Sequence, residues 1–79
     1  MWEVEYELPA SNYLADNGSL VSKLFFAMEA LAETEGFPPE GVRQLADGVL
    51  ASVMEGHIIF FERYEESRIV SIIAIQPRE

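Results

Sequence analysis

The chain has 79 residues, 49% of them hydrophobic, a formal net charge of −9 and no cysteine. This length predicts a single domain over residues 1–79, and the hydrophobic content excludes a disordered tail. The lack of cysteine excludes a disulfide framework and a thiolate zinc site, and no stretch reaches the roughly 18–20 apolar residues of a membrane span. Because the acidic start of the chain is unlike a basic signal peptide, we expect a cytoplasmic protein without membrane contact.

The negative charge is unevenly spread along the chain. Residues 1–40 hold eight acidic residues and one lysine, whereas residues 41–79 hold six acidic residues and four arginines. Such a field repels nucleic-acid backbones, which proteins bind by neutralising phosphates, so we expect no direct binding of free nucleic acid. The charge fits two interpretations: solvated faces that keep a small domain soluble, or an acidic surface for a basic partner.

The first two predicted elements are a strand and a short helix. Residues 2–8 alternate apolar side chains with three glutamates, which predicts a half-exposed strand that ends at Pro9. The glutamate row is typical of a solvated face or of a guard against edge-to-edge aggregation. Residues 10–16 predict a short helix with Tyr13 and Leu14 turned inward, and residues 17–19 predict a break.

Residues 20–35 predict a longer amphipathic helix. Its apolar stripe comprises Leu20, Val21, Leu24, Phe25, Met28, Leu31 and Ala32. Gly36 is a natural residue for the position after the helix, and Pro38 and Pro39 prevent its continuation. We expect Phe25 in the core, whereas Phe26 is a candidate for a protein interface. Residues 37–47 then predict a connection.

The last third of the chain predicts three strands. Apolar runs over residues 49–54, 57–64 and 68–75 are separated by turn signals at residues 55–56 and 65–67, and Asp47-Gly48 indicates a turn before the first run. The predicted fold is therefore an α+β domain of the order β-α-α-β-β-β. Its last three strands form an antiparallel meander, and its helices pack on one face of the sheet.

These strands are apolar on both faces, whereas a strand exposed on one side alternates apolar and polar residues. In residues 57–64, Ile58 and Phe60 oppose Ile59 and Phe61. In the last strand, one set is Ile69, Ile73 and Ile75, and the other is Val70, Ile72 and Ala74. Since the long helix covers one face, we expect a partner protein or a second copy of the chain to cover the other. The predicted partner-binding residues are Phe26, Ile59, Phe61, Arg63, Val70 and Ile72.

Candidate chemistry begins with His57, the single histidine. Its ordinary pKa near neutrality suits acid–base catalysis, and the alternative is a hairpin residue bonded to backbone. A lone histidine in a chain without cysteine gives little material for a metal site, so we expect neither a metal nor a cofactor. Arg63 and Arg68 flank the last hairpin among glutamates, which indicates exposed ion pairs.

Three segments match a known family in order and spacing. They are Trp2-Glu3-Val4-Glu5-Tyr6, the helical Phe26-Ala27-Met28-Glu29-Ala30-Leu31-Ala32, and Gly56-His57-Ile58-Ile59-Phe60-Phe61 followed by the apolar run to Gln76-Pro77. On these segments the chain resembles the RelE/ParE superfamily of bacterial toxins from type II toxin–antitoxin, or plasmid stabilisation, modules. The resemblance implies a compact toxin domain that a cognate antitoxin neutralises by wrapping a segment around it.

Members of this superfamily either cleave messenger RNA on the ribosome, using basic residues on the sheet, or poison DNA gyrase. By position, the resemblance places the catalytic residues at Arg43, His57 and Arg78. His57 stands where the active nucleases carry arginine, and no lysine follows Lys23. We therefore expect a toxin-like protein that acts by binding an antitoxin and a target such as gyrase or the translation machinery. The alternatives are a ribosome-dependent mRNA endoribonuclease, and an acidic inhibitor or nucleic-acid mimic of the phage anti-defence type on the same fold.

Overall fold

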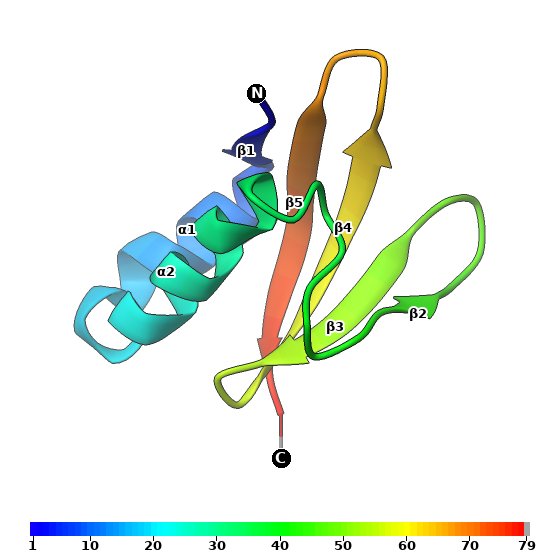
Figure 1. Ribbon diagram of the computed structural model, residues 1–79. Helices are drawn as coiled ribbons and strands as arrows, with labels where there is room; N and C mark the ends of the chain where they lie inside the picture. The colour runs from blue at the N-terminus through cyan, green and yellow to red at the C-terminus, as the bar shows by residue number, and fades with distance from the viewer. Residues whose placement is uncertain (79) are drawn as a thin grey trace.

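The computed structural model describes residues 1–78, with the backbone alone for Leu20 (Figure 1). The elements are β1 (Glu3–Tyr6), α1 (Leu8–Asp16), a 3-10 turn (Gly18–Leu20), α2 (Ser22–Glu29), a second 3-10 turn (Ala30–Ala32), β2 (Arg43–Gln44), β3 (Leu50–Met54), β4 (His57–Tyr64) and β5 (Ile69–Pro77). The predicted order β-α-α-β-β-β is confirmed. The two-residue strand β2 lies inside the segment that the sequence indicated as a connection.

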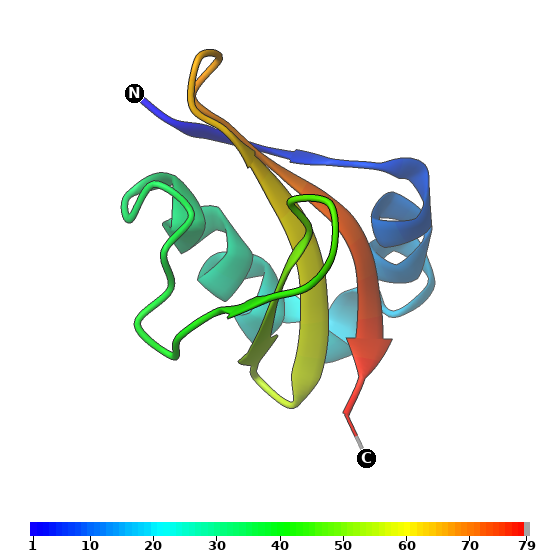
Figure 2. The same cartoon turned by 90° about the vertical axis from the view of Figure 1, so that its right-hand side faces the viewer.

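The strands of residues 1–78 form one sheet in the order β1-β5-β4-β3-β2. The predicted antiparallel meander of β3, β4 and β5 is confirmed, and β1 joins it as a parallel neighbour of β5. Both helices lie on the same side of this twisted sheet, as predicted (Figures 1 and 2). The result is a two-layer α+β domain with one sheet face under the helices.

The hairpin turns follow the residues that the sequence marked. Glu55 and Gly56 have φ values of +46° and +75°, and they join Met54 to its cross-strand partner His57. Asp47 and Gly48 also have positive φ, +57° and +79°. Two consecutive residues with positive φ give the turn whose twist matches that of paired strands, which is why Asp-Gly and Glu-Gly suit these places.

The first helix begins two residues before its predicted start and ends at Asp16 as predicted, whereas the second α-helix is shorter than predicted at both ends. Pro9 does not merely end the first strand, because it lies in the first turn of α1, where its missing N–H costs no helical hydrogen bond. The predicted helix over residues 20–35 is an α-helix over Ser22–Glu29 alone, continued by a 3-10 turn. Its end tightens ahead of Glu35 and Gly36, whose φ values of +57° and +84° stop the helix.

The hydrophobic core lies between the helices and the sheet. Its fully buried members are Ala10, Val21, Leu24, Met28, Leu31, Met54, Ile59, Phe61, Val70, Ile72 and Ile75. Four residues of the predicted helical stripe are therefore core residues. Phe25 is not: its side chain is 41% exposed and stacks on Tyr6 at the rim of the helix layer, with 6.1 Å between ring centroids.

A β-bulge in β5 changes which residues of that strand share a face. Phe60 pairs with Ala74, but Phe61 pairs with Ile72, so Ile73 is an extra residue between them. One extra residue reverses the alternation beyond it. Ile75 therefore joins Val70 and Ile72 on the helix side, which corrects the sequence prediction that grouped Ile75 with Ile69 and Ile73.

Candidate partner-binding face

The two faces of the sheet can be assigned from the strand register, because directly opposed residues share a face. The face toward α1 and α2, here called the helix face, carries Ile59, Phe61, Val70 and Ile72. The opposite face, here called the open face, has no helix or strand packed on it within residues 1–78. It carries Arg43, Ala51, Val53, Ile58, Phe60, Glu62, Tyr64, Ile69, Ser71, Ala74, Gln76, Glu3 and Glu5.

Four predicted partner-binding residues lie on the wrong face for that role. Ile59, Phe61, Val70 and Ile72 each have 0% exposed surface beneath the helices. A partner cannot reach them without displacing the chain's own core, so the prediction of contacts at these four positions is corrected. The sequence showed two apolar sets in each strand, but which set the helices cover depends on the packing.

Arg63 also lies on the helix face, where it fastens three segments together. Its guanidinium carbon lies 5.0 Å from the centroid of the Trp2 ring and 4.0 Å from that of Phe37. Its Nε donates a hydrogen bond of 2.6 Å to the carbonyl oxygen of Glu35, and an ion pair joins it to Glu65 at 3.7 Å. Arg63 thus holds the N-terminus and the turn after the second 3-10 segment onto β4, which leaves its cation engaged within the chain.

Gly36 is required beside this arginine. Its φ is +84°, and a Cβ placed there would lie 2.8 Å from Cγ of Arg63. A side chain would therefore both strain the backbone and push Arg63 out of its position. Gly36 therefore has a packing role in addition to its predicted role at the end of the helix, and the sequence alone did not show the packing role.

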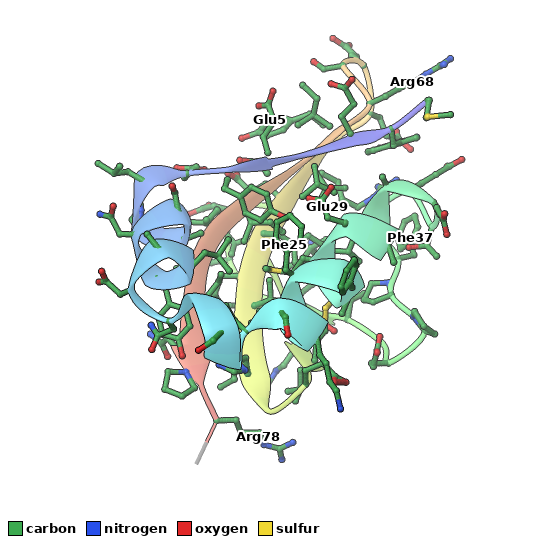
Figure 3. All side chains as sticks on the ribbon, turned by 90° about the vertical axis from the view of Figure 1, so that its left-hand side faces the viewer. Glu5, Phe25, Glu29, Phe37, Arg68 and Arg78 are labelled. Atoms are coloured by element: carbon green, nitrogen blue, oxygen red, sulfur yellow. The ribbon has the colours of Figure 1, made fainter. Side chains whose placement is uncertain are left out.

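Phe26 is the predicted partner residue that the structure leaves accessible. It lies on α2 with 73% of its surface exposed, in edge contact with Phe25. Together they border a shallow apolar depression that also includes Leu14 and Val21. This depression belongs to the helix layer, where Figure 3 shows the neighbouring Phe25, so Phe26 and the open face are separate surfaces.

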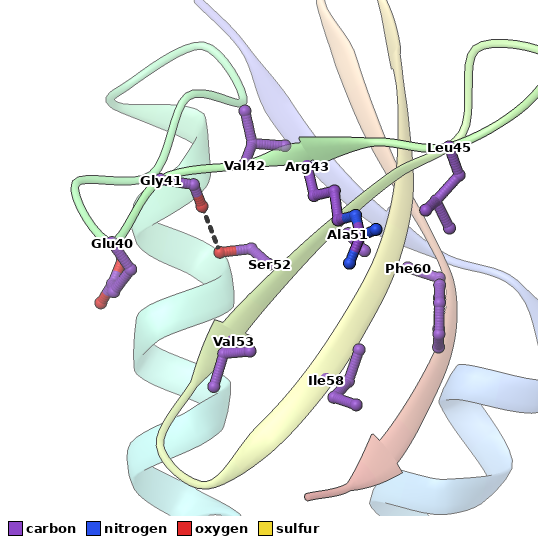
Figure 4. Close-up of a pocket in the computed structure, with 10 residues that line it drawn as sticks. All are labelled: Glu40, Gly41, Val42, Arg43, Leu45, Ala51, Ser52, Val53, Ile58 and Phe60. Carbon is purple, nitrogen blue, oxygen red and sulfur yellow. Dashed lines mark hydrogen bonds between the residues drawn. The ribbon is translucent and has the colours of Figure 1, made fainter.

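The open face contains a groove of about 580 Å³ along β2, β3 and β4 (Figure 4). Its apolar lining comprises Val42, Leu45, Ala51, Val53, Ile58 and Phe60. Arg43 lies over its cross-strand partner Ala51, and Glu40 stands at one end (Figure 4). Val42, Leu45 and Val53 are 39–41% exposed. Apolar side chains are thus presented to solvent in a concave surface.

The other half of the open face is acidic. Glu5 pairs with Ser71, which pairs with Glu62, so two glutamates flank one serine across three strands. Ser71 donates a hydrogen bond of 3.2 Å to Glu7, and Tyr64 donates one of 3.0 Å to Glu62, which raises the pKa of Tyr64. Glu3 lies on the same face of β1 as Glu5. We call Glu3, Glu5, Glu7 and Glu62 the acidic strip, and within residues 1–78 no lysine or arginine forms an ion pair with it.

His57 is held in place by two hydrogen bonds. Nδ1 donates to the Glu55 carbonyl oxygen at 2.9 Å, so Nε2 accepts from the Tyr13 hydroxyl at 3.0 Å. The two rings also meet edge to face, with centroids 5.6 Å apart. These contacts join the β3–β4 turn to α1 and match the neutral imidazole, which offers one donor and one acceptor. The bonding of His57 to backbone at a hairpin is the structural alternative that the sequence left open.

The three predicted catalytic residues do not form one cluster. Arg43 lies on the open face, whereas His57 lies on the helix face and contacts α1. Arg78 follows β5, where its backbone N–H donates to Gly56 at the end of the β3–β4 hairpin. From the row of Ala51, Phe60 and Ala74 to Arg78 there are four residues of extended chain, or about 13 Å. A cleavage site requires its cations and its acid or base around one phosphate.

The residues that the structure describes contain neither a cluster of metal ligands nor a helix that could span a membrane. No three His, Asp or Glu side chains of residues 1–78 converge as metal ligands would. None of the described helices has the length and apolar character of a membrane span.

The apolar residues of the open face were missed as a group by sequence reasoning. A weak signal existed: Glu62 shares a face with Ile58 and Phe60, and Ser71 shares a face with Ile69, so β4 and β5 each carry at least one polar residue on this face. The signal in the opposite direction was Arg63, a charged residue that shares a face with Ile59 and Phe61. Its stacking between two aromatic rings allows a cation to border the helix-covered core, which a sequence pattern does not show.

Comparison with known proteins supports the fold. No family model matches the sequence, and no curated protein does. A solved structure does match: a chain of the toxin–antitoxin complex RelBE2 from Mycobacterium tuberculosis superposes with a TM-score of 0.73. The alignment covers 98% of each chain at 17% sequence identity. At this identity the similarity establishes the architecture: the chain has the fold of the matched chain of the RelBE2 complex.

Proposed function

We propose that the chain is the RelE/ParE-like toxin component of a bacterial type II toxin–antitoxin module, and that it acts by binding proteins. The observation that carries this proposal is the match to a chain of the RelBE2 complex over 98% of both chains. The cognate antitoxin is the first proposed partner, and a cytoplasmic target such as gyrase or the translation machinery is the second.

Binding is favoured over cleavage by how the side chains are placed. The open face offers an apolar groove of about 580 Å³ next to the unpaired acidic strip. Such a concave apolar surface with a polar border is typical of a protein interface. An RNA substrate would instead meet repulsion from Glu3, Glu5, Glu7 and Glu62, while Arg43 and His57 stand on opposite faces of the sheet.

Expression in a bacterium tests the proposal. The chain is induced alone and together with the protein encoded by the adjacent gene, and growth and complex formation are measured. We expect slower growth with the chain alone, recovery with the neighbour, and a stable complex of the two proteins. Normal growth in both cases, together with no complex, would contradict a toxin–antitoxin module.

The endoribonuclease alternative is decided by a triple variant, Arg43→Ala/His57→Ala/Arg78→Ala. We expect this variant to slow growth as the wild type does, because a binding toxin does not need a catalytic trio. Primer extension on translated messages should show no new 5′ ends with either protein. Cleavage by the wild type that disappears in the triple variant would favour the nuclease. Folding of the variant is checked by circular dichroism.

The acidic strip favours a second candidate function, an inhibitor of a basic host protein. Three of its carboxylates lie along residues 3–7 and the fourth, Glu62, lies on β4, and none forms an ion pair with a lysine or arginine among the described residues. In that case the chain alone would leave growth unaffected and would bind a basic enzyme rather than the product of the adjacent gene. The growth experiment therefore separates this candidate from the toxin.

A further inference from the structure

The open face has two halves of opposite character, and together they define the chemistry of what covers it. One half is the apolar groove of β2, β3 and β4, and the other is the acidic strip of β1, β4 and β5. Phe60 and Glu62 stand on the same face of β4, about 7 Å apart, and β1 lies two strand spacings, about 10 Å, from β4. One bound segment can therefore reach both halves.

The acidic half costs the free protein electrostatic energy. Glu5 and Glu62 flank Ser71 on adjacent strands, and Glu7 accepts a hydrogen bond from the same serine. Among residues 1–78, the arginine in an ion pair is Arg63, which binds Glu65 and two aromatic rings on the helix side. Arg68 and Arg78 lie at opposite ends of the molecule (Figure 3). Arg68 adjoins the strip through the backbone, since the N–H of Glu3 donates to its carbonyl oxygen, but it forms no ion pair there, so within residues 1–78 the strip is open to a cation from another molecule.

A second copy of the chain is a poor occupant of this face. Each copy carries a net charge of −9. Across a two-fold axis, a strip of four carboxylates would face either the same strip or the groove that holds the single cation Arg43. Nucleic acid is repelled by the same field. Charge complementarity and apolar burial are satisfied together by a protein segment that combines aliphatic side chains with lysine or arginine.

We propose that the open face binds a basic, aliphatic segment of a partner protein, with its apolar side chains in the groove and its cations on the acidic strip. This inference rests on the proposed function, because it names the chemistry of the partner that a toxin of this kind would bind. The segment has a direction: its basic end lies over β1, and its apolar end lies near Arg43, where a lysine would be repelled. Because β1 and β2 are four strand spacings apart, or about 19 Å, about six residues of an extended segment separate the two ends.

Two synthetic peptides provide the test. Both have 12 residues and the same valines in one half, and the other half carries lysines in one peptide and glutamates in the other. Binding to the wild-type chain is measured by fluorescence anisotropy at 50 and 300 mM NaCl. We expect the lysine peptide to bind at least tenfold more tightly than the glutamate peptide at 50 mM, and most of this preference to disappear at 300 mM.

Charge-matched variants separate the strip from the net charge. Glu5→Gln/Glu62→Gln removes two carboxylates from the open face, and Asp16→Asn/Glu33→Gln removes two from exposed positions of the helical layer. We expect the first variant to lose about five- to tenfold in affinity for the lysine peptide, and the second less than twofold. Val53→Ser in the groove should weaken binding of both peptides severalfold.

Two results would overturn the inference. One is equal binding of the two peptides, and the other is an equal loss in both charge variants, which would show attraction to the net charge alone. Dimerisation of the chain through the open face would also contradict it, and sedimentation of the wild type and of Val53→Ser tests this. If the peptide results contradict this inference while the protein encoded by the adjacent gene still restores growth, the toxin–antitoxin proposal is kept and the proposed basic, aliphatic partner segment is rejected.

Discussion

The two faces of the sheet differ in what covers them. On the helix face, Ile59 and Phe61 are fully buried by the chain's own helices, and the one cation, Arg63, is bound by a carbonyl oxygen, a carboxylate and two aromatic rings. On the open face, Val53 is 40% exposed, and the acidic strip has no cation within residues 1–78. The strands are apolar on both sides, and the fold uses one side for its own stability. The other side is available for binding.

The largest expected contrast is between the neighbours Phe61 and Phe60. Phe61→Ala should lower the free energy of unfolding by about 3–5 kcal/mol, because it leaves a cavity in a fully buried site. Phe60→Ala should cost about 1 kcal/mol, since its side chain already borders solvent. Urea denaturation measures both. If Phe61→Ala does not fold, Phe61→Leu is compared with Phe60→Leu instead. Equal losses of stability at the two positions would contradict the assignment of faces.

Arg63→Ala should have the next largest effect and lower the free energy of unfolding by about 2 kcal/mol. It removes the hydrogen bond of a charged donor and the stacking on Trp2 and Phe37. The matched variant Arg68→Ala removes an exposed turn arginine and should change stability by less than about 0.5 kcal/mol. Thermal unfolding followed by the fluorescence of Trp2 reports both. If the two variants behaved alike, Arg63 would not be a structural clamp.

Tyr6→Phe should lower the free energy of unfolding by about 1 kcal/mol near neutral pH, because Tyr6 donates a hydrogen bond to Glu29 that links β1 to α2. Burial, aided by this carboxylate, raises the pKa of Tyr6 above its ordinary value of 10.0. The folded state therefore retains a proton that the unfolded state releases above pH 10, so this contribution to stability falls as the pH rises beyond 10. Denaturation at pH 8 and pH 11 should show a smaller alkaline loss in Tyr6→Phe than in the wild type. An equal loss would remove Tyr6 from this role.

The smallest expected change has the opposite sign. Glu5→Gln/Glu62→Gln should leave stability unchanged or raise it by about 0.5 kcal/mol at low salt, because like charges on the same face, one strand apart on either side of Ser71, repel. Denaturation at 20 and 500 mM NaCl measures the gain, which should disappear at high salt. A clear loss of stability would mean that these carboxylates have stabilising contacts within the chain.

Much of the fold follows from the sequence because its signals are local. The hairpin turn at Glu55-Gly56, the helix stop at Gly36 and the alternation in β1 each depend on a few adjacent residues, and each agrees with the structure. The bulge at Ile73 could not be predicted in the same way. A bulge depends on how β5 pairs with β4, and one extra residue reverses which side chains face the core.

The candidate site was harder to predict than the fold. With apolar residues on both sides of each strand, sequence alone could not tell which side the helices cover, and four residues were assigned to the wrong face. The position of Arg63 reinforced that choice, because a charged residue usually marks a solvated face. Phe26 is exposed, because a residue off the apolar stripe of a helix points to solvent, and its contact with a partner stays a prediction.

Thiol protection at the open face tests the central claim most directly. The chain has no cysteine, so one can be introduced at Val53 on the open face or at Lys23, an exposed position of the helical layer. The rate of thiol modification is measured for Val53→Cys and Lys23→Cys, free and in complex with the product of the adjacent gene. We predict that complex formation slows modification at position 53 at least tenfold and leaves position 23 unchanged. Protection at position 23 with full reactivity at position 53 would contradict the account.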